Sequence, residues 1–325
     1  MPDVTLDQIE AASFEALRAH GASDWIAREV ARAVRRAEQT GNVICGLYYL
    51  ESYCTQLASG RVSGVVEPEV TRPRPGAVKA DAKFGFAQPA FARGFSEVCT
   101  AARENGVATL AVAHAHTCTS LGFFTEQFAA AGLIAIGMTN ASPVVAPPGG
   151  NAKTIGTNPI AMSVPGENGG VAMHFDFSTS AVALGKITMA KAAGEAIPLG
   201  WAVDASGAPT TDPEAALGGA LVSAGGYKGW GFGLMVELLA AGMTGSVNSL
   251  DVAGLKLPDG APHGLGQFYI VMDASTYSAD FYERFKRVAE AVDAQDGARM
   301  PGAQRREMDV VPVPDALWDS VTALA

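Results

Sequence analysis

The fold is decided by residues 107–138, which read VATLAVAHAHTCTSLGFFTEQFAAAGLIAIGM. The apolar run at 107–112 predicts a buried strand, and a second apolar run at 133–138 predicts another. Between them a polar turn leads into a helical stretch at 120–131. The order strand, helix, strand predicts an α/β fold with loops after both strands that are long enough to bind a ligand.

The polar turn at 113–120 holds two histidines, two threonines, a cysteine and a serine. Because a helix N-terminus offers free N–H groups and a field that favours anions, a pyrophosphate could bind here. Thr119 and Ser120 also suit helix capping, and capping beside buried, hydrogen-bonded histidines explains the same residues. A third interpretation is a metal site of His114, His116 and Cys118, although no fourth ligand is evident nearby.

C-terminal to this unit, residues 139–159 are rich in Gly, Pro, Asn and Thr. They are typical of a binding loop, with ordinary turn chemistry as the alternative. The segment GGYKG at 225–229 precedes an apolar stretch, 229–241, which predicts a buried helix. The glycines at 229, 231 and 233 in this stretch do not form a dinucleotide-binding fingerprint, because their spacing is wrong and no strand immediately precedes them. A nicotinamide cofactor would therefore need a fold other than the Rossmann fold.

The N-terminal segment is predicted to be helical. Thr5 and Gln8 form a capping box that opens a helix, and Ser23 caps a second helix that ends near Thr40. An amphipathic stretch at 47–57 predicts a third helix. Near the other end of the chain, residues 279–295 predict a long amphipathic helix.

The middle of the chain is rich in short strands. These β-rich pieces are predicted at 76–80, 84–89, 171–175, 200–203 and 268–273. We therefore expect a helical domain made of residues 1–65 with about 275–325. Residues 66–274 are expected to form a β-rich domain that binds cofactor and substrate.

Composition excludes several functional classes. The chain has 325 residues, 48% of them hydrophobic and 17% charged, with a net charge of −10. An acidic chain without a Lys/Arg-rich run is poorly suited to nucleic acids or anionic membranes. It has no signal-peptide pattern and no apolar run of about 18 residues, so no membrane span is expected. The four cysteines show no metal or redox spacing, which favours reduced thiols in the cytoplasm.

Six short motifs, taken together and in this order, carry a resemblance to a known family. They are GFAQPA (85–90), GTNPIA (156–161), DFSTS (176–180), PTTDP (209–213), GGYKG (225–229) and RMPG (299–302). Over residues 37–306 the chain resembles the type-2 malate/L-lactate dehydrogenase family. Within that family it is most similar to the Δ1-piperideine-2-carboxylate/Δ1-pyrroline-2-carboxylate reductase branch.

The resemblance implies an α/β (α+β) fold that is not a Rossmann fold, with a mainly antiparallel sheet in the cofactor domain, and a homodimer. It implies a contact of Thr157 with substrate. The cofactor-binding residues that it implies are Thr117, Cys118, Thr119, Ser120, Leu121, Asp176, Phe177, Ser178, Tyr227, Arg299, Pro301, Gly302 and Arg305. Arginines between 299 and 306 favour NADP (NADPH) because they can meet a 2′-phosphate, while NAD stays possible.

The chain departs from the reductase branch at its catalytic motif. Members of that branch carry Ser-His-Gly-x-x-Arg, where the serine and histidine belong to a proton relay and the arginine holds the carboxylate. Here residues 44–49 read ICGLYY, so all three side chains are missing. The relay aspartate is replaced by Lys186. The histidine that serves as base in ureidoglycolate-type members falls on Thr117.

These departures bear on the substrate. A ketone must be protonated as hydride arrives, whereas a cyclic imine is more basic and can enter already protonated. We therefore expect hydride transfer to C2 of a small cyclic 2-imino acid, similar to Δ1-pyrroline-2-carboxylate, or of a 2-oxo acid. His116, Cys45 and Tyr49 are the candidate proton donors. Lys186 is the candidate for holding the carboxylate as a point charge, with a surface or structural lysine as the alternative.

Three other functions remain open from the sequence. The same fold could act as a 2-hydroxy-acid dehydrogenase on malate, lactate or sulfolactate. A metal-dependent lyase or hydrolase would use His114, His116 and Cys118 as ligands. A catalytically silent relative would bind the cofactor and turn nothing over.

Overall fold

The computed structural model describes residues 1–305 and 307–325. Its helices are α1 (Leu6–Ala19), α2 (Asp24–Gln39), α3 (Leu47–Ala58), α4 (Ala87–Asn105), α5 (Gly122–Ala130), α6 (Leu184–Ala193), α7 (Pro213–Gly218), α8 (Tyr227–Val236), α9 (Phe281–Asp293) and α10 (Asp315–Thr322). Shorter helical turns are η1 (Val43–Cys45), η3 (Ser249–Asp251) and η4 (Ala274–Thr276), and η2 (Glu237–Gly242) is a π-helix.

The strands are β1 (Asp3–Thr5), β2 (Glu69–Arg74), β3 (Ala77–Asp81), β4 (Val107–Ala115), β5 (Ile134–Thr139), β6 (Ile160–Pro165), β7 (Val171–Phe177), β8 (Ala202–Val203), β9 (Pro209–Thr210), β10 (Ala220–Leu221), β11 (Leu265–Met272) and β12 (Val310–Pro312). Within the described residues the main sheet has the order β2-β3-β4-β11-β5-β6-β7. Its neighbours are antiparallel except β3 and β4, so the expected mainly antiparallel α/β fold is confirmed.

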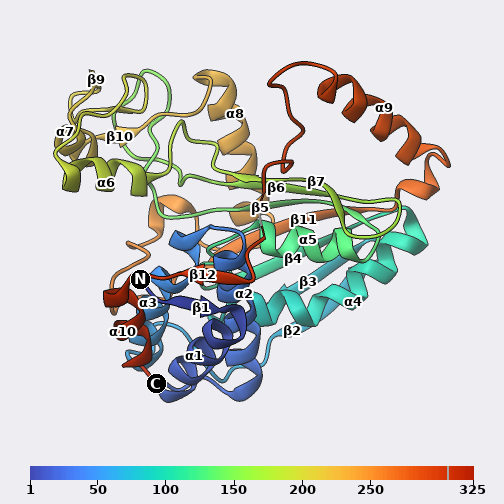
Figure 1. The fold of residues 1–325 in the computed structure, drawn as a ribbon, viewed down its shortest axis with the longest axis horizontal. Coiled ribbons are helices and arrows are strands. Elements are labelled where there is room, and N and C mark those ends of the chain that lie inside the picture. Colours follow the sequence, from blue (N-terminus) through green and yellow to red (C-terminus); the bar gives the residue numbers. More distant parts are fainter. Residues whose placement is uncertain (306) are drawn as a thin grey trace.

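The unit that decides the fold forms as predicted, with one addition. Strands β4 and β5 flank α5, but β11 lies between them and pairs antiparallel with both. Helices α4 and α5 cover one face of the sheet (Figure 1), where aromatic rings including Phe91, Phe124 and Phe128 form the core with Tyr269. Burial of these large apolar side chains stabilises this face.

The N-terminal helices pack below the sheet in Figure 1. The predicted capping box is present, because Gln8 N–H donates to the Thr5 hydroxyl and Thr5 N–H donates to the Gln8 side chain. Helix α10 packs on α1 and α3, and β12 pairs with β1, which brings the two termini close together. Helix α9 buries none of its residues and lies apart from the N-terminal helices. The division into two domains stays a prediction.

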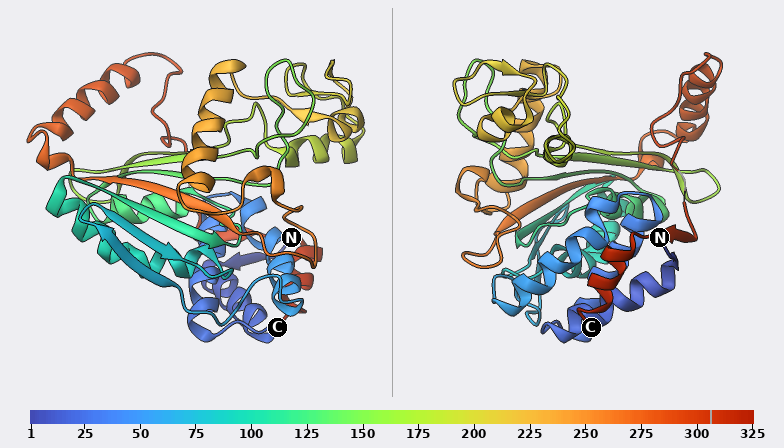
Figure 2. Two further views of the ribbon diagram at one scale, coloured as in Figure 1. Left: turned by 180° about the vertical axis from the view of Figure 1, so that it is seen from behind. Right: turned by 60° about the vertical axis from the view of Figure 1, so that its left-hand side comes forward.

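A smaller lobe lies on the other side of the sheet. It contains α6, α7, α8 and β8–β10, and Figure 2 shows the long strands between this lobe and the N-terminal helices. Its own core includes Val145, Ile155, Ile187 and Leu221. None of the described helices combines the length and the apolar character needed to cross a membrane.

Two sequence predictions about local structure were wrong. Residues 84–89 were expected to be β-rich, but Phe84 has a φ of +63° and helix α4 already begins at Ala87. The apolar stretch at 229–241 was expected to be a buried helix. It forms most of α8 and most of η2, in which Phe232 is 57% exposed and Leu238 60% exposed. The stretch is apolar all round, so its pattern could not reveal that only one side packs on the sheet.

Candidate active site

Residues from two distant segments meet where β4 gives way to α5. The Thr119 hydroxyl lies 3.3 Å from the Cys45 carbonyl oxygen and 2.7 Å from that of Cys118, and the Tyr53 hydroxyl donates to it at 3.3 Å. Thr119 adopts a φ of +58°, which is uncommon for a residue other than glycine. The turn therefore lies against η1 and the start of α3. We call Cys45, Tyr49 and Thr119 the Cys45 corner.

Asp176, at the end of β7, caps the start of α5. Its Oδ2 accepts a 2.7 Å hydrogen bond from Gly122 N–H and lies 3.5 Å from the Ser120 hydroxyl. The prediction that Thr119 and Ser120 cap this helix was wrong. The Asp176 carboxylate lies at this helix N-terminus, and the pyrophosphate site predicted there stays a prediction.

The charge of Asp176 reaches the Cys45 corner. Burial, followed by the Asp176 charge, raises the pKa of the Cys45 thiol to about 12. Burial also raises the pKa of the Tyr49 phenol and, chiefly, that of Asp176 itself. The thiol and the phenol are therefore both protonated at neutral pH, and neither titrates near it.

A cleft of about 730 Å³ opens beside this corner. It is lined by Ser120, by the end of β7 up to Asp176, and by residues of the segments 40–42 and 299–305. Gly302, with a φ of +86°, lies so close to β7 that a Cβ atom there would be 2.9 Å from the His174 carbonyl oxygen. The backbone of Pro301 also accepts a hydrogen bond from His174 N–H. Residues of the RMPG motif and Asp176 of the DFSTS motif therefore line the same cleft, and their role in binding a cofactor stays a prediction.

The two predicted phosphate-binding arginines differ in their surroundings. Arg305 contacts the buried carboxylate of Glu126, which also bonds Arg36 at 2.8 Å. Arg299 bonds the Gln304 side chain at 2.6 Å and forms no ion pair within the described part of the chain. Arg305 thus joins the segment 299–305 to α5, while Arg299 is available to an anion. Arg306, the end of the predicted basic segment, lies outside the described residues.

His116 is not positioned to give a proton to a substrate, contrary to the sequence prediction. It is 2% exposed, and its Nε2 donates to the Gln56 Oε1 at 2.5 Å, because Gln56 Nε2 is used on the carbonyls of Leu255 and Leu257. Its ring stacks on His263 with 4.0 Å between centroids. Burial, followed by the neighbouring His263, holds the pKa of His116 well below its usual value, so it is a neutral core residue.

The metal hypothesis finds no support in the geometry. His114 has a φ of +50° and bonds Asp81 and the Gly245 carbonyl, away from the buried rings of His116 and His263. Cys118 is buried, and burial raises its pKa to about 12, which disfavours a thiolate ligand. Among the residues that the structure describes, no cluster of three or more His, Cys, Asp or Glu is suited to hold a metal ion.

Other predicted cofactor residues divide into buried and accessible ones. Thr117, Cys118 and Leu121 are buried, so their side chains support the turn and do not face the cleft. Phe177 and Tyr227 are 54% and 72% exposed. Tyr227 lies at the start of α8, in the lobe, and forms no side-chain hydrogen bond that links it to the Cys45 corner.

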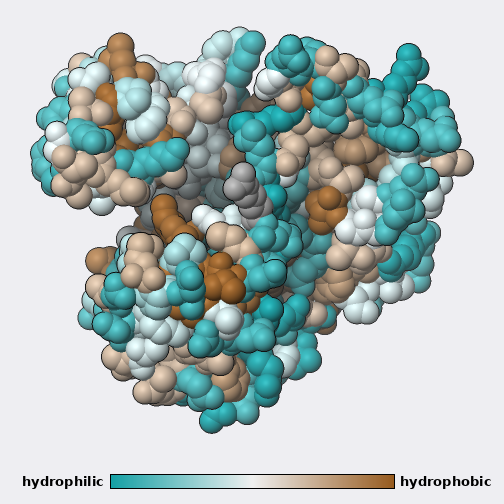
Figure 3. Space-filling view, in the orientation of Figure 1, coloured by the Kyte–Doolittle hydropathy of each residue, from teal (hydrophilic) through white to brown (hydrophobic). Residues whose placement is uncertain are grey.

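The predicted substrate residues lie on the side of the lobe. The Thr157 carbonyl accepts hydrogen bonds from Thr179, so the GTNP motif lies beside Ser178. Lys186 is exposed on α6, whose start lies near Ile44: a Cβ atom on Gly185 would be 3.5 Å from the Ile44 side chain. Figure 3 shows the molecule hollowed between the lobe and the N-terminal helices. The structure thus places α6 across the hollow from η1.

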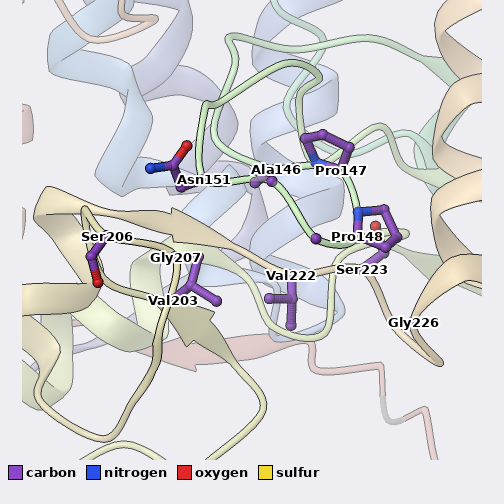
Figure 4. A pocket seen from close by; sticks show the side chains of 12 residues that line it. Ala146, Pro147, Pro148, Asn151, Val203, Ser206, Gly207, Val222, Ser223 and Gly226 are labelled. Carbon is purple, nitrogen blue, oxygen red and sulfur yellow. The ribbon is translucent and has the colours of Figure 1, made fainter.

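A second cavity, of about 430 Å³, lies within the lobe (Figure 4). It is lined by prolines and glycines of residues 147–150 together with small side chains such as Ser206 and Ser223. None of its lining residues has a titratable side chain. This cavity therefore cannot supply acid–base chemistry, and the Cys45 corner remains the candidate active site.

Sequence reasoning missed several polar residues behind the corner. Gln56 and Arg61 are buried, and His263 packs on His116 from a loop almost 150 residues away. The position of Gln56 could have been predicted from the helical spacing, because it lies on the same face of α3 as Tyr49 and Tyr53. No local pattern pointed to Lys256, whose ammonium lies 5.4 Å from the centre of the Tyr49 ring.

A family model described as malate/L-lactate dehydrogenase matches residues 4–322. The chain belongs to this family. The resemblance inferred from the six motifs is thereby confirmed, and the chain is an oxidoreductase. Individual members of the malate/L-lactate dehydrogenase family match nearly the whole chain, which supports the same assignment.

The (2R)-3-sulfolactate dehydrogenase (NADP(+)) of Chromohalobacter salexigens is 36% identical over 327 residues, covering 99% of this chain and 98% of the relative. The Δ1-pyrroline-2-carboxylate reductase of Ancylobacter novellus is 35% identical, covering 99% and 97%. The crystal structure of Δ1-piperideine-2-carboxylate reductase from Pseudomonas syringae matches with a TM-score of 0.93 at 33% identity and covers both chains fully.

Proposed function

We propose that the chain is an NADPH-dependent reductase of a small cyclic 2-imino acid, similar to Δ1-pyrroline-2-carboxylate. The observation that carries this choice of substrate is the absence, among the described residues of the Cys45 corner, of an imidazole that could deliver a proton near neutral pH. A protonated imine brings its own proton, so it needs only a hydride and correct placement. Relatives named as pyrroline-2-carboxylate reductases support the same choice.

The five histidines are all engaged away from this corner. His20 bonds the Ala16 carbonyl, His114 bonds Asp81, and His116 and His263 form the buried stack. His174 lines the cleft, but its two ring nitrogens contact Ser163 and Glu126. Burial lowers the pKa of His174 to about 4, so it carries no proton to donate at neutral pH.

The cleft beside the corner fits a dinucleotide. It combines about 730 Å³ of space with Arg299 for a 2′-phosphate, and with the Asp176 carboxylate and Ser120 hydroxyl for polar groups of the cofactor. The bound NADPH supplies the hydride. The residues of the chain bind and orient the acid, and the lobe and N-terminal helices shield it from water. We expect NADH to serve as a weaker cofactor.

The 2-hydroxy-acid dehydrogenase activity is a second candidate, since one relative is named as a sulfolactate dehydrogenase. In that reaction the developing alkoxide needs a proton. The Cys45 thiol, with its pKa raised to about 12, is protonated at neutral pH and is acidic enough to give one to an alkoxide.

One substrate panel separates the two candidates. The purified protein is assayed with Δ1-pyrroline-2-carboxylate, pyruvate and 3-sulfopyruvate, each with NADPH and with NADH. We expect kcat/KM for the imine to exceed that for the oxo acids by about 10²-fold or more. This is the typical rate loss when a reaction that needs a general acid lacks one. Imine reduction should also decline at alkaline pH, because less of the imine is protonated. Equal or faster reduction of 3-sulfopyruvate would favour the second candidate.

We further propose a cytoplasmic homodimer. Large hydrophobic side chains are exposed along α8, η2 and the segment that follows: Phe232, Leu234, Met235, Leu238, Met243 and Leu250. An apolar surface of this extent is typical of an interface between subunits. The four cysteines are free, which suits a reducing compartment.

A further inference from the structure

Side chains of α3 and of the residues after it hold the loop 254–261 in place. Tyr49 donates a hydrogen bond to the Leu255 carbonyl at 3.2 Å, and Gln56 donates to the carbonyls of Leu255 and Leu257, each at 2.8 Å. Arg61 donates to Leu257 at 2.6 Å, as well as to the carbonyls at 254 and 261. Although it has no regular secondary structure, this loop is fixed to the helix that carries Tyr49.

Lys256 lies between Leu255 and Leu257, whose carbonyls accept most of these hydrogen bonds. Its ammonium is 5.4 Å from the centre of the Tyr49 ring, within the range of a cation–π interaction. The same charge acts on the Cys45 thiol, whose pKa it tends to lower against the larger effects of burial and Asp176. The Lys256 ammonium therefore lies within electrostatic reach of the Cys45 corner.

Two other cations near the cleft are already paired with carboxylates. Arg305 and Arg36 both contact Glu126, and Arg36 also bonds Glu307 at 2.6 Å. Arg299 lines the cleft, where it suits a phosphate. Lys256 forms no ion pair with any described carboxylate, so its charge is available to a ligand.

We propose that Lys256 binds the anionic group of the substrate at the Cys45 corner and thereby selects 2-imino or 2-oxo acids over uncharged analogues. The inference rests on the proposed function, because it requires that such an acid enters this corner. Lys256 would act as a point charge, and Tyr49 and the fixed loop would position it. The carboxylate is present in both the bound substrate and the transition state, so this contact would act mainly on KM.

The test compares Lys256→Met with Lys256→Arg. With the imine and saturating NADPH, we expect Lys256→Met to raise KM about 10- to 100-fold with kcat within about threefold, the signature of lost uniform binding. Lys256→Arg should restore most of the affinity. The Met variant should also lose the preference of the wild type for the acid over its methyl ester. Lys286→Met, on the exposed helix α9, is the matched control and should behave as wild type.

A binding experiment separates this inference from the proposed function. Pyrrole-2-carboxylate is planar and cannot be reduced, and its Kd is measured by calorimetry with NADP⁺ present. We expect Lys256→Met to weaken it about tenfold, the usual effect of losing one charge contact of about 1.4 kcal/mol, even if no substrate is turned over. If the wild type reduces the imine while Lys256→Met leaves KM and this Kd unchanged, the role of Lys256 is wrong. It is also overturned if only Lys186→Met produces the KM effect.

Discussion

Asp176 combines two effects that a single substitution can separate. Its carboxylate accepts a hydrogen bond from Gly122 N–H at the start of α5, and its charge opposes ionisation of Cys45. An asparagine keeps an oxygen for the helix cap but removes the charge. An alanine removes both.

Asp176→Asn should therefore lower the pKa of Cys45 and shift its alkylation by iodoacetamide to lower pH. The other three cysteines are buried, so the modification followed by mass spectrometry reports on Cys45. Asp176→Ala should shift alkylation likewise and also cost about 1 kcal/mol of stability through loss of the cap. An alkylation profile that is the same in Asp176→Asn and wild type would contradict this electrostatic link.

At the scale of single residues, the sequence indicated some neighbours in the candidate site but not the burial or pairing of each side chain. Asp176 of the DFSTS motif and the RMPG motif line the same cleft, and Cys45 does lie beside Thr119. The prediction that His116 donates a proton was wrong because the local sequence around β4 does not reveal that a loop near residue 263 covers this side chain. Arg305 is paired and Arg299 is free to bind an anion because Glu126, which is far away in the chain, contacts only Arg305 of the two.

Among the elements, the turn after β4 is joined to the loop before β11 by two neutral histidines. Thr117 N–H donates to His263 Nδ1, so the His263 proton resides on Nε2, and His116 donates through its own Nε2 to Gln56. Burial lowers the pKa of His263 to about 3. As pH falls, the unfolded chain therefore binds protons near the usual value of 6.5 while the folded chain does not.

The free energy of unfolding should then decrease as pH falls from about 7 towards 5. A single histidine of this kind contributes about 2 kcal/mol of loss at pH 5, and the contacting pair will not be additive. Urea denaturation at pH 8 and pH 5 measures the difference. His263→Asn keeps an acceptor for Thr117 N–H and should reduce the pH dependence by a similar amount. The prediction fails if this variant loses as much stability between the two pH values as the wild type.

Local periodicity correctly predicted most helices and the strands β4 and β5. It could not predict that β11 lies between those strands, because pairing over more than 120 residues leaves no local pattern. The apolar α8–η2 segment also shows what local sequence cannot predict. Hydrophobicity predicted burial there, but did not say whether the covering surface belongs to the same chain or to a second one.

For the whole molecule, the exposed apolar surface of α8 and η2 leads to a test of assembly. Leu238→Glu places a charge in the middle of that surface and should convert the proposed dimer into a monomer, because a buried unpaired charge is costly. Sedimentation equilibrium gives the mass directly. Val65→Glu, at a position that is 70% exposed and remote in sequence, should remain dimeric. A wild-type monomer, or dimers of both variants, would refute the proposed interface.

The position of β11 at the centre of the sheet has a consequence for biosynthesis. On the ribosome, β4 and β5 emerge well over a hundred residues before the strand that joins them, so the nascent chain carries two unpaired strand edges for much of its translation. Closure of the sheet awaits residue 272, which makes completion of the core a late and cooperative event.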